Sequence, residues 1–134
     1  MIRQRAFTLF ELLVSVSIIA ILVAIATISY SSVQKKARDS RRVSDMDSIQ
    51  KAAEQYYSQN SYVYPLTTSA FVTSGLLRLW PTDPKGVGYT AYVYGIATTY
   101  CACAATEDLT LGNSSTNTCS FVASGRFYCV KSQQ

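Results

Sequence analysis

The chain has 134 residues, of which 49% are hydrophobic and 15% are charged, with a net charge of +4 and no histidine. This length suits one domain, and the absence of histidine removes the most common general base and the most common neutral metal ligand. The positive excess is too small to indicate nucleic-acid binding by itself, and no pattern of residues nominates a catalytic site, so we do not expect an enzyme.

A polar segment, 1–6, opens the chain and is followed by an apolar stretch, 7–30. The apolar stretch reads FTLFELLVSVSIIAILVAIATISY, with no glycine or proline and with Glu11 as its one charged residue. A helix needs about 20 apolar residues to cross a bilayer. We therefore predict a membrane-spanning helix over 7–30.

The junction between these segments resembles the N-terminus of type IV prepilins and of the pseudopilins of type II secretion. The shared pattern is a short basic leader, a small residue, and Phe-Thr-Leu-Phe-Glu at the head of an apolar helix. The resemblance implies that a prepilin peptidase cuts between Ala6 and Phe7 and that the new amino group of Phe7 is methylated. The one departure is Ala6, because this family usually has glycine before the cut.

Glu11 has two interpretations. A charge at the centre of a membrane helix costs roughly 2.5–3.5 kcal/mol on insertion scales. Glu11 either lies near the cytoplasmic end, partly hydrated or protonated, or it waits for a positive partner. We favour the second, because the resemblance implies that Glu11 pairs with the free amino group of Phe7 in a neighbouring subunit during filament assembly.

Beyond the apolar stretch, no glycine or proline occurs before Pro65, and apolar residues continue at a spacing of three to four. We predict one helix over 7–58, with a helical hairpin broken near Ser31-Ser32 as the alternative. Its second part, 31–58, carries an apolar stripe that packs on the C-terminal region. The residues of the stripe are Val33, Ala37, Val43, Met46, Ile49, Ala53, Tyr56 and Tyr57.

A basic run, 35–42, lies where this helix would leave the membrane. We interpret it as a solvated helix face. Contact with acidic lipid head groups, or with Asp45, Asp47 or Glu54 of a neighbouring subunit, is the alternative. Counting basic residues on either side of the apolar stretch favours a cytoplasmic location for this end. The prepilin resemblance and the cysteines favour the outside, and we follow these two.

The segment 59–88 is predicted to hold a short helix over 69–77, capped by Ser69, and a turn-rich loop over 80–88. This loop resembles one in major pseudopilins, which often bind calcium near their C-terminus. The acidic residues of the C-terminal half are Asp83, Glu107 and Asp108. These carboxylates are candidate calcium ligands, but no loop spacing supports the site, and we expect no cofactor.

The C-terminal segment 89–131 is predicted to form three or four antiparallel strands. The expected strands are 89–96, 98–104, and a hairpin of 119–123 with 126–131 through a type I′ turn at Ser124-Gly125, with a polar loop over 106–118. The predicted fold class is α+β, in which a long N-terminal helix packs on a small antiparallel sheet, as in pilins. The predicted division is a leader, 1–6, a transmembrane or filament-core helix, 7–30, and a globular domain, 31–134.

The four cysteines, Cys101, Cys103, Cys119 and Cys129, all lie in the last third of the chain. An even number in an exported domain indicates two disulfides. Cys101 and Cys103 are poor partners for each other, because a separation of two residues in an extended chain rarely gives disulfide geometry. Each therefore pairs with Cys119 or Cys129, and the pairing stays open. Four free thiols and a zinc site are the alternatives.

The function that follows from the resemblance is that of a structural subunit of a type IV pilus or pilus-like filament, polymerised through its N-terminal helix. The implied partners are further copies of the chain, a prepilin peptidase, an assembly platform and an assembly ATPase. The implied location is the cytoplasmic membrane, with the C-terminal domain outside, and then an extracellular pilus.

Two alternatives from the same family remain: a type II secretion pseudopilin, and a minor pilin for adhesion or DNA uptake. A membrane-anchored extracellular enzyme that never assembles is a further rival. For DNA, the basic residues among the tyrosines are Arg78, Lys85, Arg126 and Lys131.

Overall fold

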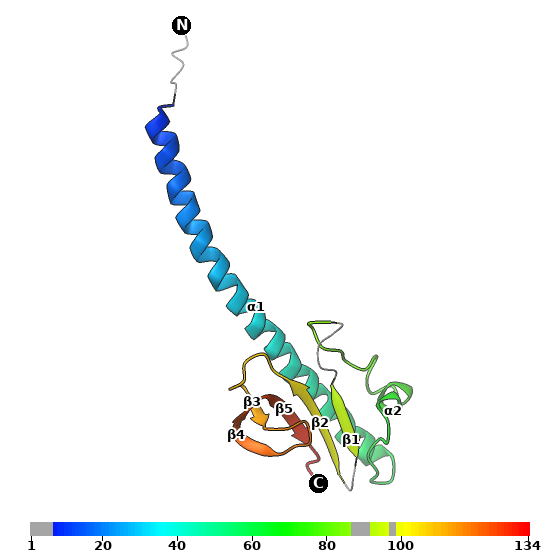
Figure 1. Cartoon of the computed structure of the whole chain (residues 1–134). Helices are drawn as coiled ribbons and strands as arrows, with labels where there is room; N and C mark the ends of the chain where they lie inside the picture. The colour runs from blue at the N-terminus through cyan, green and yellow to red at the C-terminus, as the bar shows by residue number, and fades with distance from the viewer. Residues whose placement is uncertain (1–6, 87–91, 97–98) are drawn as a thin grey trace. The chain divides into compact units, whose positions relative to one another are not determined.

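The structure, a computed structural model, describes residues 7–86, 92–96 and 99–134. Helix α1 (Leu9–Gln59) is followed by the short helix α2 (Thr68–Thr73) and by five strands (Figure 1): β1 (Val93–Ile96), β2 (Tyr100–Ala105), β3 (Gly112–Ser114), β4 (Phe121–Gly125) and β5 (Phe127–Lys131). The predicted α+β fold class, a long helix with a small antiparallel sheet, is confirmed. The leader 1–6 with Ala6, the first part of the predicted strand 89–96, and Thr98 lie outside the described residues.

Helix α1 is continuous over 51 residues, which confirms the long helix and shows that the alternative of a hairpin broken at Ser31-Ser32 is wrong. Its C-terminus is set by two residues in the left-handed region, Ser61 and Tyr62. The backbone N–H of Tyr62 donates to the carbonyl of Tyr57 at 3.0 Å, a bond that closes a helix end of the Schellman type. The chain divides into two compact units, Met1–Gln34 and Lys35–Gln134.

In the first unit, the described part of α1 is apolar and exposed. By length and composition it is the one helix among the described residues that is suited to crossing a membrane, and its most apolar 18-residue window has a mean hydropathy of 2.7 and no buried residues. The exposed side chains of this part include leucines, isoleucines and valines of the predicted span, such as Leu9, Ile18 and Ile25. Such a surface needs lipid or other apolar helices as its environment.

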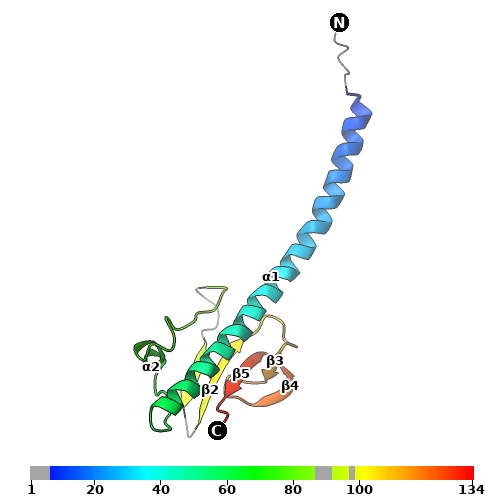
Figure 2. The same ribbon diagram turned by 180° about the vertical axis from the view of Figure 1, so that it is seen from behind.

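In the second unit, the five strands form one sheet in the order β1-β2-β5-β3-β4. Every described pairing is antiparallel, and β2 and β5 pair over the longest register, from Cys101 opposite Lys131 to Ala105 opposite Phe127. The view from behind in Figure 2 shows the C-terminal part of α1 lying across the sheet, and Figure 1 shows α2 on the side of β1, with β4 at the opposite edge.

The predicted hairpin of 119–123 with 126–131 is wrong. Strands β4 and β5 are joined through Arg126 alone, and β3 lies between them in the sheet. A hairpin connection with a type I′ turn needs two central residues with positive φ, and Gly125 is not among the positive-φ glycines. Strand β3 itself lies inside the segment 106–118 that we predicted to be a loop.

Gly125 is required for a different reason. A Cβ atom on Gly125 would overlap the backbone of Ser114, and one on Gly112 would overlap the backbones of Gly125 and Phe127. The two glycines therefore allow β3 to enter the corner between β4 and β5.

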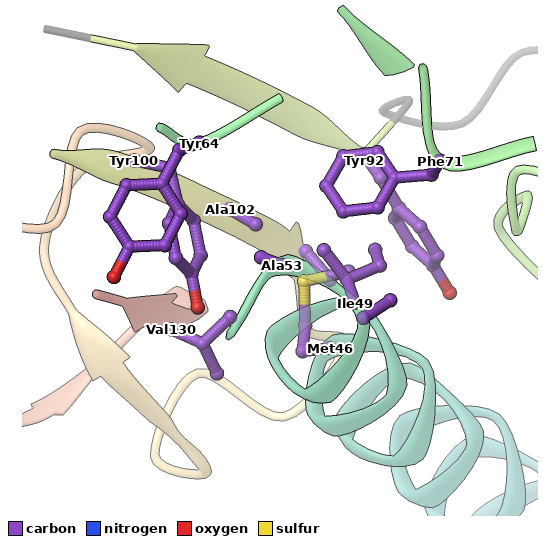
Figure 3. Close-up of a cluster of buried hydrophobic side chains, with 11 residues drawn as sticks. Met46, Ile49, Ala53, Tyr64, Phe71, Tyr92, Tyr100, Ala102 and Val130 are labelled. Carbon is purple, nitrogen blue, oxygen red and sulfur yellow. The ribbon is translucent and has the colours of Figure 1, made fainter. Parts of the chain in front are cut away.

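The core lies between α1 and the sheet, as Figure 3 shows for Met46, Ile49 and Ala53 facing Tyr100, Ala102 and Val130. Tyr64, Phe71 and Tyr92 complete the labelled cluster. Tyrosine hydroxyls at its edge bond to carboxylates of α1: Tyr92 donates to Asp45 at 2.8 Å, and Tyr64 to Glu54 at 3.1 Å. Burial and the bond to Glu54 raise the pKa of Tyr64 to about 12.

Two details of the predicted helices differ from the structure. The apolar stripe of α1 does not begin at Val33 and Ala37, which are exposed. Helix α2 ends at Thr73 and not at Leu77, and its N-cap is Thr67, whose hydroxyl contacts that of Ser69 at 2.9 Å, so the prediction of Ser69 as the cap is wrong. Leu76 and Leu77 still pack against the core from the following turn.

Candidate functional site

The predicted processing site lies at the start of α1, where Phe7 is 84% exposed. Thr8 and Glu11 form a reciprocal pair there. The backbone N–H of Glu11 donates to the Thr8 hydroxyl at 3.2 Å, and the backbone N–H of Thr8 donates to the Glu11 carboxylate at 3.0 Å. The Thr8 hydroxyl also contacts that carboxylate at 3.0 Å. This arrangement is a capping box, which satisfies N–H groups that a helix start otherwise leaves unpaired.

The capping box gives Glu11 a role within its own chain. The pattern Thr-x-x-Glu before an apolar run is a recognised sequence signature of this motif, and Thr8 to Glu11 carries it. We interpreted Glu11 by its charge alone and missed this signature. The structure therefore shows a carboxylate that is held in place at the helix start, one helical turn from Phe7.

The second unit contains a buried charged cluster centred on Arg42, whose side chain is 0% exposed. Its guanidinium binds Asp83 through two nitrogens, at 2.6 and 2.8 Å. A third nitrogen contacts Asp39 at 2.6 Å and Glu107 at 3.1 Å. Arg42 therefore joins α1 to two loops far away in sequence, and the forked, two-nitrogen contact is one that only arginine makes.

Two further cations complete the cluster at its outer side. Arg38 binds Glu107 through two nitrogens, at 2.5 and 2.8 Å, and the Lys85 ammonium lies 3.6 Å from the same carboxylate. The Asp39 carboxylate also accepts the backbone N–H groups of Glu107 and Asp108, each at 2.9 Å. Among the described residues, no buried side-chain nitrogen or oxygen lacks a hydrogen-bond partner.

Hydrogen bonds within this cluster favour the ionised forms of Glu107, Arg42 and Arg38. The bond from Arg38, with that from Arg42, outweighs burial and lowers the pKa of Glu107 to about 2. Burial disfavours the charged form of Arg42, but the bonds to Asp83, Asp39 and Glu107 outweigh it and raise the pKa of Arg42. The bond to Glu107 raises the pKa of Arg38.

This cluster corrects our interpretation of the basic run 35–42 as a solvated helix face. Lys35, Lys36 and Arg41 are exposed, but Arg42 is fully buried and Arg38 is partly buried. The positions 39, 42, 46, 49 and 53 follow the three-to-four spacing of a buried helix face. The spacing therefore contained the signal, and we missed it because two of the positions are charged.

The candidate calcium ligands divide between two environments. The carboxylates of Asp83 and Glu107 lie on Arg42, whereas that of Asp108 accepts the backbone N–H and the hydroxyl of Thr110, at 2.9 and 2.7 Å. The bonds from Thr110 lower the pKa of Asp108. Two of the three candidates therefore already have a cation as their partner.

The four cysteines meet on the face of β2 that points away from α1. Tyr100, Ala102 and Ala104 face the core, so the alternate residues Cys101 and Cys103 face the other side. The structure pairs Cys101 with Cys119 and Cys103 with Cys129, leaving no free cysteine. Cys103 and Cys129 are direct neighbours across β2 and β5. All four sulfurs lie within 4.8 Å of one another.

Two comparisons with known proteins bear on what this chain is similar to. The family described as "Prokaryotic N-terminal methylation motif" matches residues 1–27. The chain therefore carries a prepilin-like methylation motif on a pilin-like α+β fold.

The chain is similar to the type II secretion system core protein G of Pectobacterium carotovorum subsp. carotovorum. The two are 31% identical over 103 residues, an alignment that covers 65% of each chain. The chain thus spans about two thirds of the length of the curated relative that it matches. No solved structure matches the chain.

Proposed function

We propose that the chain is a structural subunit of a pilus-like filament, polymerised through its N-terminal helix. The observation that carries this proposal is an apolar helix, exposed on all sides, whose first turn bears the methylation motif. Such a helix is stored in the cytoplasmic membrane and then exchanges lipid contacts for contacts with the helices of neighbouring subunits. The folded domain Lys35–Gln134 forms the outer surface of the filament.

Between the filament types, the relative from Pectobacterium favours a pseudopilus of a type II secretion system, because that protein is named as a core component of such a system. A surface type IV pilus is the second candidate, since the methylation motif suits both. Deleting the gene discriminates between them. A pseudopilin predicts loss of protein secretion with no change in surface pili, and a pilin predicts the reverse.

The first experiment tests processing. A prepilin peptidase cuts between Ala6 and Phe7, the Phe7 amine is methylated, and each of the two disulfides removes two hydrogens. We expect filament or sheared material to begin at Phe7 with one added methyl group and all four cysteines oxidised. The measurement is intact mass with N-terminal sequencing of the sheared and membrane fractions. A chain that stays in the membrane, begins at Met1 and keeps free thiols would contradict the proposal.

A second experiment separates the two roles of Glu11. A capping box accepts glutamine in place of glutamate, so Glu11→Gln keeps the bonds to Thr8 and removes the charge. Thr8→Ala removes the cap and keeps the charge. If Glu11 pairs with the amine of a neighbouring Phe7, Glu11→Gln abolishes filaments in electron micrographs, whereas Thr8→Ala weakens the helix start by only about 1 kcal/mol and keeps them. Filaments in the Glu11→Gln strain would refute the pairing.

A further inference from the structure

The second unit has a polar recess of about 410 Å³ beside the buried charged cluster, lined by Lys35, Lys85, Thr106, Glu107, Leu109 and Arg126. The recess draws on α1, on the loop before residue 87, on the loop after β2 and on the link between β4 and β5. Four segments that are distant in sequence therefore place three cationic side chains around one hollow.

The charge balance indicates that the recess attracts an anion. The buried cluster has three cations, Arg38, Arg42 and Lys85, and three carboxylates, Asp39, Asp83 and Glu107, so its formal charges cancel. The Glu107 carboxylate in the recess is thus already neutralised. Lys35 and Arg126 are exposed on its rim and add two positive charges outside this balance.

The position of Lys35 in the chain indicates which anion it meets. Lys35 follows the apolar stretch 7–30 by five residues, which span at most about 18 Å even when fully extended. Each head-group layer of a bilayer is about 5–7 Å thick. Within the continuous helix α1 these five residues rise only about 8 Å, so Lys35 itself stays within reach of lipid head groups whenever 7–30 spans the membrane.

We propose that this recess binds the phosphate of an anionic phospholipid in the membrane that holds the apolar helix. Lys35 and Arg126 contact the phosphate, and Leu109, which is 63% exposed at the rim, contacts the apolar part of the lipid. The inference rests on the proposed function in one respect, that the helix resides in a membrane before assembly. An acidic surface of a neighbouring subunit is the competing occupant, but nothing tethers such a surface to the recess before the filament forms.

The test uses the full chain in nanodiscs that contain equal amounts of phosphatidylglycerol and phosphatidylcholine. After transfer to a mild detergent, native mass spectrometry identifies the retained lipids. We expect an excess of phosphatidylglycerol that falls at least about fivefold in the double variant Lys35→Gln/Arg126→Gln, since each basic residue near an anionic surface contributes about a fivefold effect. The control, Lys51→Gln/Arg78→Gln, makes the same charge change at two exposed sites away from the recess and should retain the excess.

Several outcomes would overturn the proposal. The first is that the unmodified chain retains no excess of phosphatidylglycerol, and the second is that both double variants lose this excess equally. The third is that millimolar glycerol phosphate displaces the lipid, which would indicate a site for soluble anions. If Lys35→Gln/Arg126→Gln retained the lipid but formed no filaments, the occupant of the recess would be a neighbouring subunit and not a lipid. Whether Glu11→Gln forms filaments tests the proposed function alone, because lipid retention is measured on the unassembled chain.

Discussion

At the scale of single residues, Arg42 is the side chain on which the folded domain depends for its charge balance. Burying a guanidinium costs several kcal/mol, and only close, well-oriented carboxylates offset that cost. Asp39, Asp83 and Glu107 provide them, from α1 and from two loops. The cluster therefore specifies how these loops dock on α1 more than it adds net stability.

Replacing Arg42 tests this role. Arg42→Met leaves buried carboxylates without their partner and should lower the free energy of unfolding by about 3–5 kcal/mol. Arg41→Met is the matched control, because the Arg41 side chain is 65% exposed and its ion pair with Asp45 is long, at 4.0 Å. We expect a change below about 1 kcal/mol there. Urea unfolding followed by near-ultraviolet circular dichroism measures both, and equal losses would show that the burial of Arg42 carries no special weight.

The pH dependence of stability follows from Glu107. Its pKa is lowered from 4.5 to about 2 in the folded chain, so the folded state favours the ionised form. The stability that this provides is complete above about pH 4.5 and is lost as the pH falls towards 2, by about 2–3 kcal/mol. Glu107→Gln should be less stable at pH 7 and should show a flatter profile between these limits. Parallel profiles for Glu107→Gln and the unmodified chain would contradict the assignment.

At the scale of elements, the position of β3 decides the order of the sheet. Strands β4 and β5 are adjacent in sequence, but β3 separates them, and the glycines at 112 and 125 provide the space. On the other face of β2, the two disulfides tie the segment around Cys119 and strand β5 to the sheet. The disulfides close loops of 18 and 26 residues, and in the chain-entropy treatment each raises the free energy of unfolding by about 3 kcal/mol.

A pair of glycine substitutions tests the insertion of β3. A Cβ on Gly125 would overlap the Ser114 backbone, so Gly125→Ala should cost at least about 2 kcal/mol. Gly95 on β1 has open space around its Cβ position and no positive φ, so Gly95→Ala should change stability by no more than about 0.5 kcal/mol. Thermal unfolding of both variants provides the comparison. A neutral Gly125→Ala would mean that β3 does not occupy the corner.

At the scale of the whole molecule, the two units differ in what stabilises them. The described core residues, the charged cluster and both disulfides belong to Lys35–Gln134, whereas the apolar side chains of the first unit are exposed. The second unit thus has what a domain needs to fold alone, and the first needs a lipid or helical environment.

Truncation tests this division. The fragment 31–134 should be soluble without detergent and should keep the near-ultraviolet circular dichroism and the melting temperature of the domain in the full chain, because it retains every residue of the core cluster. A companion fragment, 44–134, lacks Arg42 and Asp39 and should be less stable by several kcal/mol. If 31–134 failed to fold while the full chain did, the apolar helix would be part of the domain.

The sequence alone determined the features that depend on neighbours along the chain. The apolar stretch, the continuous helix and the α+β class follow from composition, spacing and the position of glycine and proline, whereas the methylation motif follows from a resemblance to prepilins. The structure or the comparisons agree with each of them. Even the capping box was readable in Thr8 and Glu11, because it is local.

Only the tertiary structure decided what depends on residues far apart in sequence. The position of β3 between β4 and β5, the pairing of Cys101 with Cys119, and the burial of Arg42 each join segments separated by loops. The helical spacing places Arg42 on the buried face of α1, but its partners Asp83 and Glu107 lie in distant loops, and the sequence did not identify them. Such contacts are chosen by the combined packing of the whole domain, and no local pattern encodes them.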